Sequence, residues 1–384
     1  MPEVKQSYIR LYNICFSLCF TVMLLGLIEL GAFFALRIWD PANRDRLAHD
    51  DQPVYQRESW GRKYWEEESE SARFTYQSYV GWRQLPYSGQ TITVDSELHR
   101  KTVNSQCDGS THTIWMFGGS TMWGTGSPDW ETIPSDLANI FVKAGEPVCV
   151  WNFGQTGWRN TQELIELELE LKRNPRRPDL VIFYDGFNDG YSFYQSGKVD
   201  VHMNFDSIRE QFEKSSSRRT LTSSFIDLLL STHTARLISG AHRTHSWMDG
   251  DAIRAHISDA EARKDLEVSY LDNLKVVQAL SGKYGFQYAF FWQPLIVAGH
   301  KHLTNDEEKI ISFYHGRIEE DDIEYRAMSA YLKQSSPPHL FDIADVFDAV
   351  SDTVYIDCVH VAPEGNELIA ERMYAGLHEL GWTK

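Results

Sequence analysis

Hydrophobic positions follow three successive patterns along this chain of 384 residues. The first is an apolar run near the amino terminus, in which only Glu29 carries a charge between Leu11 and Leu36. A run of that length can cross a bilayer. Residues 1–39 are therefore predicted to be a transmembrane anchor that contacts lipid through residues 11–36.

A cleavable signal peptide is the alternative interpretation, but the run is longer than such a peptide requires and no A-x-A cleavage site follows it. An acid at mid-bilayer would cost a few kcal/mol, so Glu29 is expected at the interface end of a span centred near Phe20. Basic residues flank both sides of the run and do not set its orientation.

The second pattern covers residues 40–112, a polar and aromatic-rich stretch. Its acidic run from Glu66 to Glu70 indicates a solvated helix face or a linker. The segment from Thr91 to Val94 alternates polar and apolar residues after a Pro/Gly turn region, which is a strand signal. A linker with a small accessory β element is predicted here.

The third pattern covers residues 113–384, where short apolar runs alternate with helical periodicity. Such runs are typical of parallel strands buried on both faces between helices, and predict an α/β fold. The predicted strands are residues 113–117, 148–153, 180–184, 287–292 and 340–343. The predicted helices are residues 133–143, 161–173, 259–284 and 306–332, and a last one from Pro363 towards Leu380. Residues 191–250 break the alternation and are predicted to be an insertion, with a helix near 225–238.

Composition argues against two kinds of site. The formal net charge is −17 and no Lys/Arg-rich run with interleaved aromatic residues occurs, so nucleic acid is not an expected partner. Cys15 and Cys19 lie in the apolar run, which leaves Cys107, Cys149 and Cys358. This odd set has no metal-ligand spacing, so at most one pair forms a disulfide and no metal is expected.

Candidate reactive residues follow the predicted strands, because the carboxyl ends of parallel strands border one crevice. The first strand leads into FGGSTMWG, which places Ser120 after two glycines. The second leads into NFGQTGW with Gly157, and the third into DGFNDG with Asn188. Near the carboxyl end, DCVH places Asp357 three residues before His360.

Each of these motifs also has an ordinary structural explanation, such as a turn at Asn188 or a capping role for His360. Together they meet the needs of nucleophilic catalysis: a hydroxyl, a base for its proton, a carboxylate that orients the base, and donors for an oxyanion. The first three roles are assigned to Ser120, His360 and Asp357. In a turn, Asp357 can fold back onto the ring nitrogen that faces away from the serine.

Backbone N–H groups of Ser120 and Gly157 and the Asn188 amide are the expected oxyanion donors. The G-x-S-x-G elbow of α/β-hydrolases is excluded, because Thr-Met follows the serine and the second glycine is missing. Four more residues in or after strand-end loops are candidates for substrate binding, with core packing as the alternative for the aromatic rings: Trp123, Trp158, Trp292 and Gln293.

These blocks resemble the SGNH hydrolases, the GDSL-like lipases and esterases. FGGST, NFGQTG, GFND and DCVH stand in the order of the four family blocks, over residues 113 to 375. The first block reads Gly-Gly-Ser-Thr here instead of the commoner Gly-Asp-Ser-Leu, which leaves the serine in place. The resemblance implies a three-layer α/β/α sandwich of flavodoxin-like type, a Ser-His-Asp catalytic set, and an oxyanion hole from Ser120, Gly157 and Asn188.

The resemblance also implies a function. We expect a serine esterase that removes a small acyl group, in the first instance acetyl, from a carbohydrate or related alcohol, without a cofactor. Anchored relatives imply a cytoplasmic amino terminus and an extracytoplasmic catalytic domain. Two alternatives stay open: an O-acyltransferase that modifies an extracellular polysaccharide, and a non-catalytic polysaccharide-assembly protein on the same scaffold.

Overall fold

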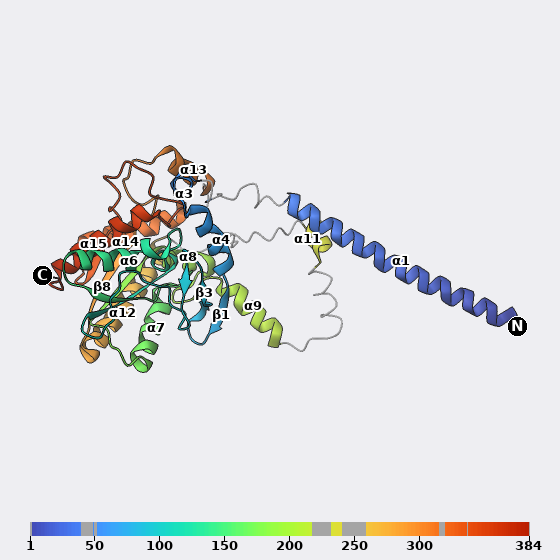
Figure 1. Cartoon of the computed structure of the whole chain (residues 1–384), viewed down its shortest axis with the longest axis horizontal. Helices are drawn as coiled ribbons and strands as arrows, with labels where there is room; N and C mark the ends of the chain where they lie inside the picture. Colours follow the sequence, from blue (N-terminus) through green and yellow to red (C-terminus); the bar gives the residue numbers. More distant parts are fainter. Residues whose placement is uncertain are drawn as a thin grey trace. The chain divides into compact units, whose positions relative to one another are not determined.

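The computed structural model describes residues 2–39, 49, 52–216, 232–239, 259–314, 319–335 and 337–383. The chain divides into two compact units (Figure 1), one of residues 1–46 with 207–250 and one of residues 47–206 with 251–384. The second unit carries every residue that was assigned a catalytic or binding role from the sequence.

The first unit contains helices α1 (Pro2–Trp39) and α11 (His233–Ser239). Within α1, Tyr12–Leu36 is long and apolar enough to cross a membrane, a property that a signal sequence shares. Glu29 accepts hydrogen bonds from the backbone N–H groups of His233 and Thr234 and from the Thr234 hydroxyl, and the His233 ring lies 2.7 Å away. The one acid of the apolar run is therefore bonded to the start of α11.

The second unit is built on a five-stranded parallel sheet with strand order β6-β5-β7-β8-β9. The strands are β5 (His112–Gly118), β6 (Val148–Asn152), β7 (Leu180–Asp185), β8 (Gln287–Trp292) and β9 (Leu340–Asp342). In chain order this is 2-1-3-4-5, the flavodoxin-like arrangement, in which ligands bind beyond the carboxyl ends of the strands. All five strands coincide with predicted ones to within one residue at each end.

Helices cover both faces of the sheet. Tyr270 of α12 (Asp259–Tyr284) packs on Phe290, whereas Gly376 of α15 (Pro363–Glu379) abuts Phe291. Since successive residues of a strand face opposite sides, α12 and α15 lie on opposite faces. Helix α6 (Ile133–Lys143) packs with α15, and α7 (Asn160–Arg173) and α14 (Glu319–Ser335) pack with α12 (Figure 1). The expected three-layer sandwich is confirmed.

The core of the sheet is aromatic. Phe117, Phe183 and Phe290 are register partners on adjacent strands, and their rings stack with centroid distances of 5.3 and 4.6 Å. All three are fully buried. Such cross-strand pairs stabilise a sheet and fix its register, which in turn fixes the strand ends that carry the reactive residues.

The accessory region packs on the same unit and is more helical than predicted. It contains α3 (Pro53–Gln56), α4 (Gly61–Ser71), the antiparallel pair β1 (Phe74–Gln77) and β2 (Gly81–Gln84), and the antiparallel pair β3 (Tyr87–Ser88) and β4 (Thr93–Val94). The acidic run lies on α4. Glu67 is not solvated as expected: it is buried and accepts hydrogen bonds from Gln90, Thr91 and Ile92.

Two other predictions, the helix over 306–332 and the insertion with a helix near 225–238, fall partly on residues outside the described part. The helix predicted over 306–332 is two helices, α13 (Asn305–Tyr314) and α14, and residues 315–318 between them lie outside the described part. In the predicted insertion, α8 (Phe187–Ser196) and α9 (Phe205–Ser216) are described with α11, whereas residues 217–231 and 240–250 are not. Of the helix predicted near 225–238, residues 225–231 therefore lie outside the described part, and α11 covers the rest from His233.

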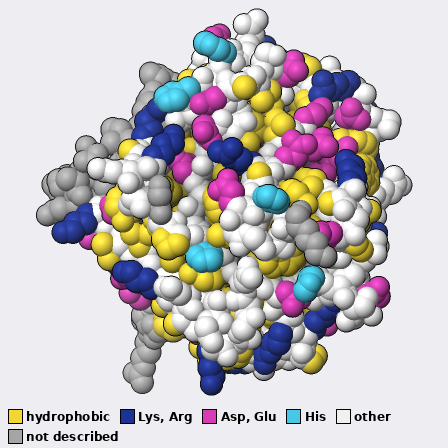
Figure 2. Space-filling model, turned by 90° about the vertical axis from the view of Figure 1, so that its left-hand side faces the viewer, with side chains coloured by type: hydrophobic (Ala, Val, Ile, Leu, Met, Phe, Trp, Pro, Cys, Tyr) yellow, Lys and Arg dark blue, Asp and Glu magenta, His cyan; other side chains and the backbone are white. Residues whose placement is uncertain are grey.

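The surface agrees with the acidic composition. On the face drawn in Figure 2, several Asp and Glu side chains form one cluster and others are scattered, whereas Lys and Arg side chains are dispersed over the face. The whole chain carries 54 acidic and 37 basic residues. The described Lys and Arg side chains of this face do not join into one contiguous patch of the kind that binds a phosphate backbone.

Candidate active site

Ser120 is the first residue of the short helix α5 (Ser120–Trp123), directly beyond the carboxyl end of β5. The two preceding glycines make close contacts that a side chain would disturb. A Cβ at Gly118 would lie 2.7 Å from the carbonyl oxygen of Tyr184, and one at Gly119 would lie 2.3 Å from Asn188 Nδ2. The missing side chains let the serine loop approach the loop after β7.

His360 lies next to this serine. Its Nε2 is 2.7 Å from Ser120 Oγ, and its Nδ1 is 2.6 Å from Asp357 Oδ2. An ionised carboxylate is only an acceptor, so Nδ1 carries the proton towards Asp357 and Nε2 is left to accept the proton of the serine hydroxyl. The three side chains form a continuous hydrogen-bonded chain, and 8% or less of each residue is exposed.

Asp357 is oriented by its own turn. Its Oδ1 accepts hydrogen bonds from the backbone N–H groups of Val359 and His360, at 2.9 and 2.7 Å. Tyr355 and Val361 form an antiparallel bridge that closes the turn. Burial alone would raise the pKa of Asp357, but the neighbouring His360 and these hydrogen bonds outweigh it and hold the pKa well below its usual range. Asp357 is therefore a permanent anion beside the imidazole.

The segments that carry the expected oxyanion donors are neighbours: Asn188 Nδ2 is bonded to Trp158, the residue after Gly157, and a Cβ at Gly119, the residue before Ser120, would lie 2.3 Å from it. Gly157 has a φ of +74°, which a residue with a side chain rarely adopts. Asn188 Nδ2 donates a hydrogen bond to the carbonyl of Trp158 at 2.6 Å, so one amide hydrogen is fixed and the other is left for a ligand. The structure therefore brings together the residues that were assigned from four distant blocks.

The three tryptophans are not placed for stacking on a sugar. Trp123, Trp158 and Trp292 are at most 2% exposed. The Arg100 guanidinium lies 4.2 Å from the Trp123 ring centroid, and Trp158 Nε1 donates to the carbonyl of Trp82. The rings therefore pack in the core, which corrects their candidate role as substrate-binding residues.

Gln293 follows β8 and is 4% exposed. Its Oε1 accepts a long hydrogen bond of 3.4 Å from the hydroxyl of Thr121, the residue after the proposed nucleophile. Its buried Nε2 has no hydrogen-bond partner among the described residues. Because a buried amide without a partner is unfavourable, Gln293 remains a candidate for a polar contact to a bound molecule.

Sequence reasoning missed the residues that support these loops. Gln52 Nε2 donates to the carbonyl of Ile356, next to Asp357, at 2.8 Å. The Tyr55 hydroxyl donates to the carbonyl of Gly126, and Asn152 Nδ2 to that of Met122 in α5. No local pattern marks these side chains, because each contact joins segments that are distant along the chain.

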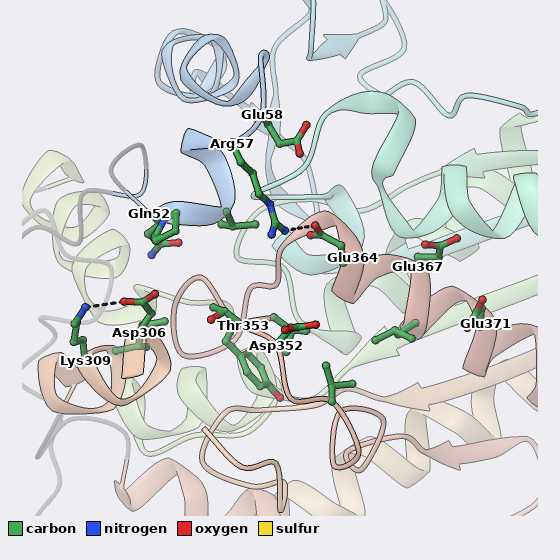
Figure 3. A pocket seen from close by; sticks show the side chains of 17 residues that line it. Gln52, Arg57, Glu58, Asp306, Lys309, Asp352, Thr353, Glu364, Glu367 and Glu371 are labelled. Atoms are coloured by element: carbon green, nitrogen blue, oxygen red, sulfur yellow. Dashed lines mark hydrogen bonds and ion pairs between the residues drawn. The ribbon is translucent and has the colours of Figure 1, made fainter. Parts of the chain in front are cut away.

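A separate pocket of about 1000 Å³ lies between α3, α13, α15 and the loop at residues 350–355 (Figure 3). Acidic residues from several segments line it: Glu58, Asp306, Asp352, Glu364, Glu367 and Glu371. Its two cations are already paired, Arg57 with Glu364 and Lys309 with Asp306. Neither Ser120 nor His360 lines this pocket, so it is not the catalytic centre.

The last features to consider are the cysteines and the possibility of a metal site. Cys107 and Cys149 form a disulfide, the pair that their spacing alone did not identify. Cys358 is fully buried. Within the described ranges, no group of three or more His, Cys, Asp or Glu side chains is arranged to hold a metal ion.

Residues 114–373 match the family described as GDSL-like Lipase/Acylhydrolase. No curated protein matches the chain in sequence.

Three solved structures are distantly similar. The acetyl xylan esterase AlAXEase is 13% identical, with 69% of this chain and 99% of that chain covered and a TM-score of 0.35. AlinE4, an SGNH-hydrolase family esterase, is 16% identical, with 71% and 98% covered and a TM-score of 0.31. A lipolytic G-D-S-L family protein from Veillonella parvula is 14% identical, with 69% and 97% covered and a TM-score of 0.34.

Proposed function

The chain belongs to the GDSL-like lipase/acylhydrolase family and is a serine hydrolase, and from this premise we propose that it removes a small O-acyl group, such as acetyl, from a carbohydrate or related alcohol. The observation that carries the proposal is the hydrogen-bonded chain from Ser120 through His360 to Asp357. This constellation performs acyl transfer on unrelated folds, so its geometry matters more than its sequence position.

The first half of the reaction forms an acyl-enzyme. Ser120 Oγ attacks the ester carbonyl carbon while His360 Nε2 takes the hydroxyl proton. The tetrahedral intermediate then breaks its bond to the alcohol oxygen, and His360 returns the proton to that oxygen. The products are a free alcohol and an ester on Ser120.

The second half reverses the roles with water. His360 takes a proton from water, the hydroxide attacks the acyl-enzyme, and Ser120 Oγ leaves and recovers the proton. Asp357 stabilises the imidazolium that forms in each half. The overall reaction consumes one water and releases the carboxylic acid, so its atoms balance without a cofactor.

Three N–H donors are assigned to the oxyanion: the backbone groups of Ser120 and Gly157 and the Asn188 amide. Among the described residues, neither of these two N–H groups donates a hydrogen bond to a backbone carbonyl of the loops. Donors fixed before the reaction cost no reorganisation when charge develops, and removal of one such donor costs about 10²- to 10³-fold in kcat.

Burial of the site supports a small acyl group. Ser120 is 8% and His360 is 6% exposed, so little of the reacting atoms is open to solvent. The unpartnered Nε2 of Gln293 is assigned to a polar contact with the bound ester or its alcohol, which suits a polar substrate better than a lipid chain.

The localisation is part of the same proposal. The apolar stretch Tyr12–Leu36 serves as an uncleaved anchor, with the amino terminus in the cytoplasm and residues 40–384 outside it. The Cys107–Cys149 disulfide supports an oxidising compartment for the catalytic unit. An accessory region at 40–112 and a catalytic domain at 113–384 remain the proposed domain limits.

The test is release of acid from acetylated oligosaccharides by the full chain in detergent, with Ser120→Ala as control. We expect the wild type to release acetate and the variant to release none above background. The same acyl-enzyme would instead transfer to a sugar hydroxyl in an O-acyltransferase. Acyl transfer to an added glycan with little free acid would therefore replace the esterase assignment, and no reaction of either kind would reject both.

A further inference from the structure

The two loops that supply the proposed oxyanion donors are joined twice, at consecutive residues. Asn188 Nδ2 donates to the carbonyl of Trp158 at 2.6 Å. One residue further along each segment, which on the Asn188 side is the first turn of α8, Arg159 pairs with Asp189: Nε and Nη2 each lie 3.2 Å from Asp189 Oδ1. The same oxygen also accepts from the backbone N–H of Asn160 at 3.3 Å.

This ion pair is inside the protein. Both side chains are only 1% exposed. Two charges in such a place are stabilised by each other, and neither can exchange its partner for water. A rigid, planar guanidinium that touches one carboxylate oxygen with two nitrogens also fixes the relative orientation of the two loops.

The other buried acids near Arg159 do not compete with Asp189 for its guanidinium group. Glu163 is fully buried, and its burial and the nearby Asp185 raise its pKa well above the ordinary value. Glu163 is therefore held in its neutral form, and neither of its carboxyl oxygens has a hydrogen-bond partner among the described residues. Asp185 has its own donor in Asn160 Nδ2, at 2.8 Å. Among the described residues, Arg159 also contacts the carbonyl of Val201 at 3.4 Å and the half-exposed Asp200 at 3.9 Å.

We propose that the Arg159–Asp189 ion pair is a positioning element of the oxyanion hole, which holds the Gly157 loop and the Asn188 loop in the register where their N–H groups converge. The inference rests on the proposed function. Arg159 and Asp189 are not catalytic residues: they act on the oxyanion through the residues next to them. Loss of the pair lets Asn188 move relative to Gly157 while Ser120, His360 and Asp357 keep their places.

A double-mutant cycle with Asn188 separates this role from a purely structural one. In the full chain, Asp189→Asn is expected to lower kcat for p-nitrophenyl acetate by about 10-fold or more, with KM changed by less than about 2-fold. In the Asn188→Ala background, the same change is expected to alter kcat by less than about 2-fold, because the donor it positions is already gone.

Glu166→Gln is the matched control. Glu166 lies on α7, the helix that begins directly after Arg159. It forms a buried ion pair with Arg83 at 2.7 Å, and the side chains of Glu166 and Arg83 are 2% and 5% exposed. Its side-chain hydrogen bonds among the described residues go to Arg83 and Arg173, not to the segments that carry Gly157 and Asn188. We expect Glu166→Gln to lower the melting temperature without a change in kcat beyond about 2-fold.

Arg159→Lys keeps the charge but loses the fixed planar contact, so it tests the proposal if Asp189→Asn does not fold. The positioning role would be overturned if Asp189→Asn lowered kcat by the same factor in the wild type and in Asn188→Ala. It would also be overturned if Glu166→Gln lowered kcat as much as Asp189→Asn does. A failure of the proposed function looks different: Asn188→Ala or Ser120→Ala would then retain the wild-type rate.

Discussion

The Nε2 atom of His360 lies 2.7 Å from Ser120 Oγ, although 240 positions separate the two residues. The parallel sheet accounts for this contact. Ser120 begins the helix after β5, and His360 lies in the turn before α15, which packs against α6 after β5. The short distance between His360 and Ser120 therefore depends on how the helices pack around the sheet.

The carboxylate of Asp357 is expected to contribute through orientation of the imidazole. Asp357→Asn removes the anionic acceptor that selects the Nδ1–H form of His360, and we expect kcat to fall by roughly 10³- to 10⁴-fold, as in serine protease triads. Steady-state ester hydrolysis measures the loss. Asp352→Asn, at an exposed position in the same loop, is the control and should keep wild-type activity. Equal rates for the two variants would remove Asp357 from the catalytic set.

The closeness of Gly119 and Asn188 predicts a selective loss of activity. A Cβ at Gly119 would lie 2.3 Å from Asn188 Nδ2, the terminal atom of a side chain that can rotate away. Gly119→Ala should therefore fold but displace the amide and lower kcat by about 10²-fold. Gly190→Ala is the comparison, because nothing lies within 4 Å of its Cβ and alanine favours α8. Similar kcat values for the two variants would contradict this account.

The buried acids predict an unusual pH dependence of stability. Burial and the charge of Asp189 raise the pKa of Asp185 from 3.8 to about 7, against the hydrogen bonds from Asn160 and Tyr270. Between these values the native state binds more protons than the unfolded state, so this group's contribution to stability decreases as the pH rises through the window.

Asp185→Asn removes this contribution. The free energy of unfolding in urea, measured at pH 5 and pH 8, should decrease less with pH in the variant than in the wild type. Asp272→Asn, whose side chain is 58% exposed on α12, should keep the wild-type difference. An unchanged difference in Asp185→Asn would mean that Asp185 is ionised throughout.

The disulfide predicts a redox-dependent stability. Cys107 and Cys149 are 42 residues apart, and closure of a loop of that size restricts the unfolded chain by about 4 kcal/mol in the chain-entropy account. Replacing both cysteines by serine should lower the free energy of unfolding by about 2–4 kcal/mol. Dithiothreitol should destabilise the wild type to a similar degree and leave the double variant unchanged. Cys19→Ser, in the apolar helix α1, is the control.

Much of the fold could be predicted from the sequence because its signals are local. Buried parallel strands appear as short apolar runs, and the residues after each run gather at one edge of the sheet. The turn at Asp357 and His360 was also local, since its hydrogen bonds span three residues. These signals require no knowledge of which segments meet.

The remaining features depend on contacts between distant segments. Gln52 reaches Ile356 across 304 positions, and neither residue is marked by periodicity. Trp292 lies in a place where a substrate ring was plausible, but Tyr270 and Tyr325 pack against it. The pairing of Cys107 with Cys149 likewise joins segments that are distant along the chain.

Labelling of the full chain with a fluorophosphonate probe tests the central claim most directly, because the probe reacts only with a serine activated by its neighbours. The account predicts a single labelled serine in the wild type, identified by mass spectrometry as Ser120, and no labelling of Ser120→Ala with unchanged thermal stability. Equal labelling of the wild type and Ser120→Ala would contradict it.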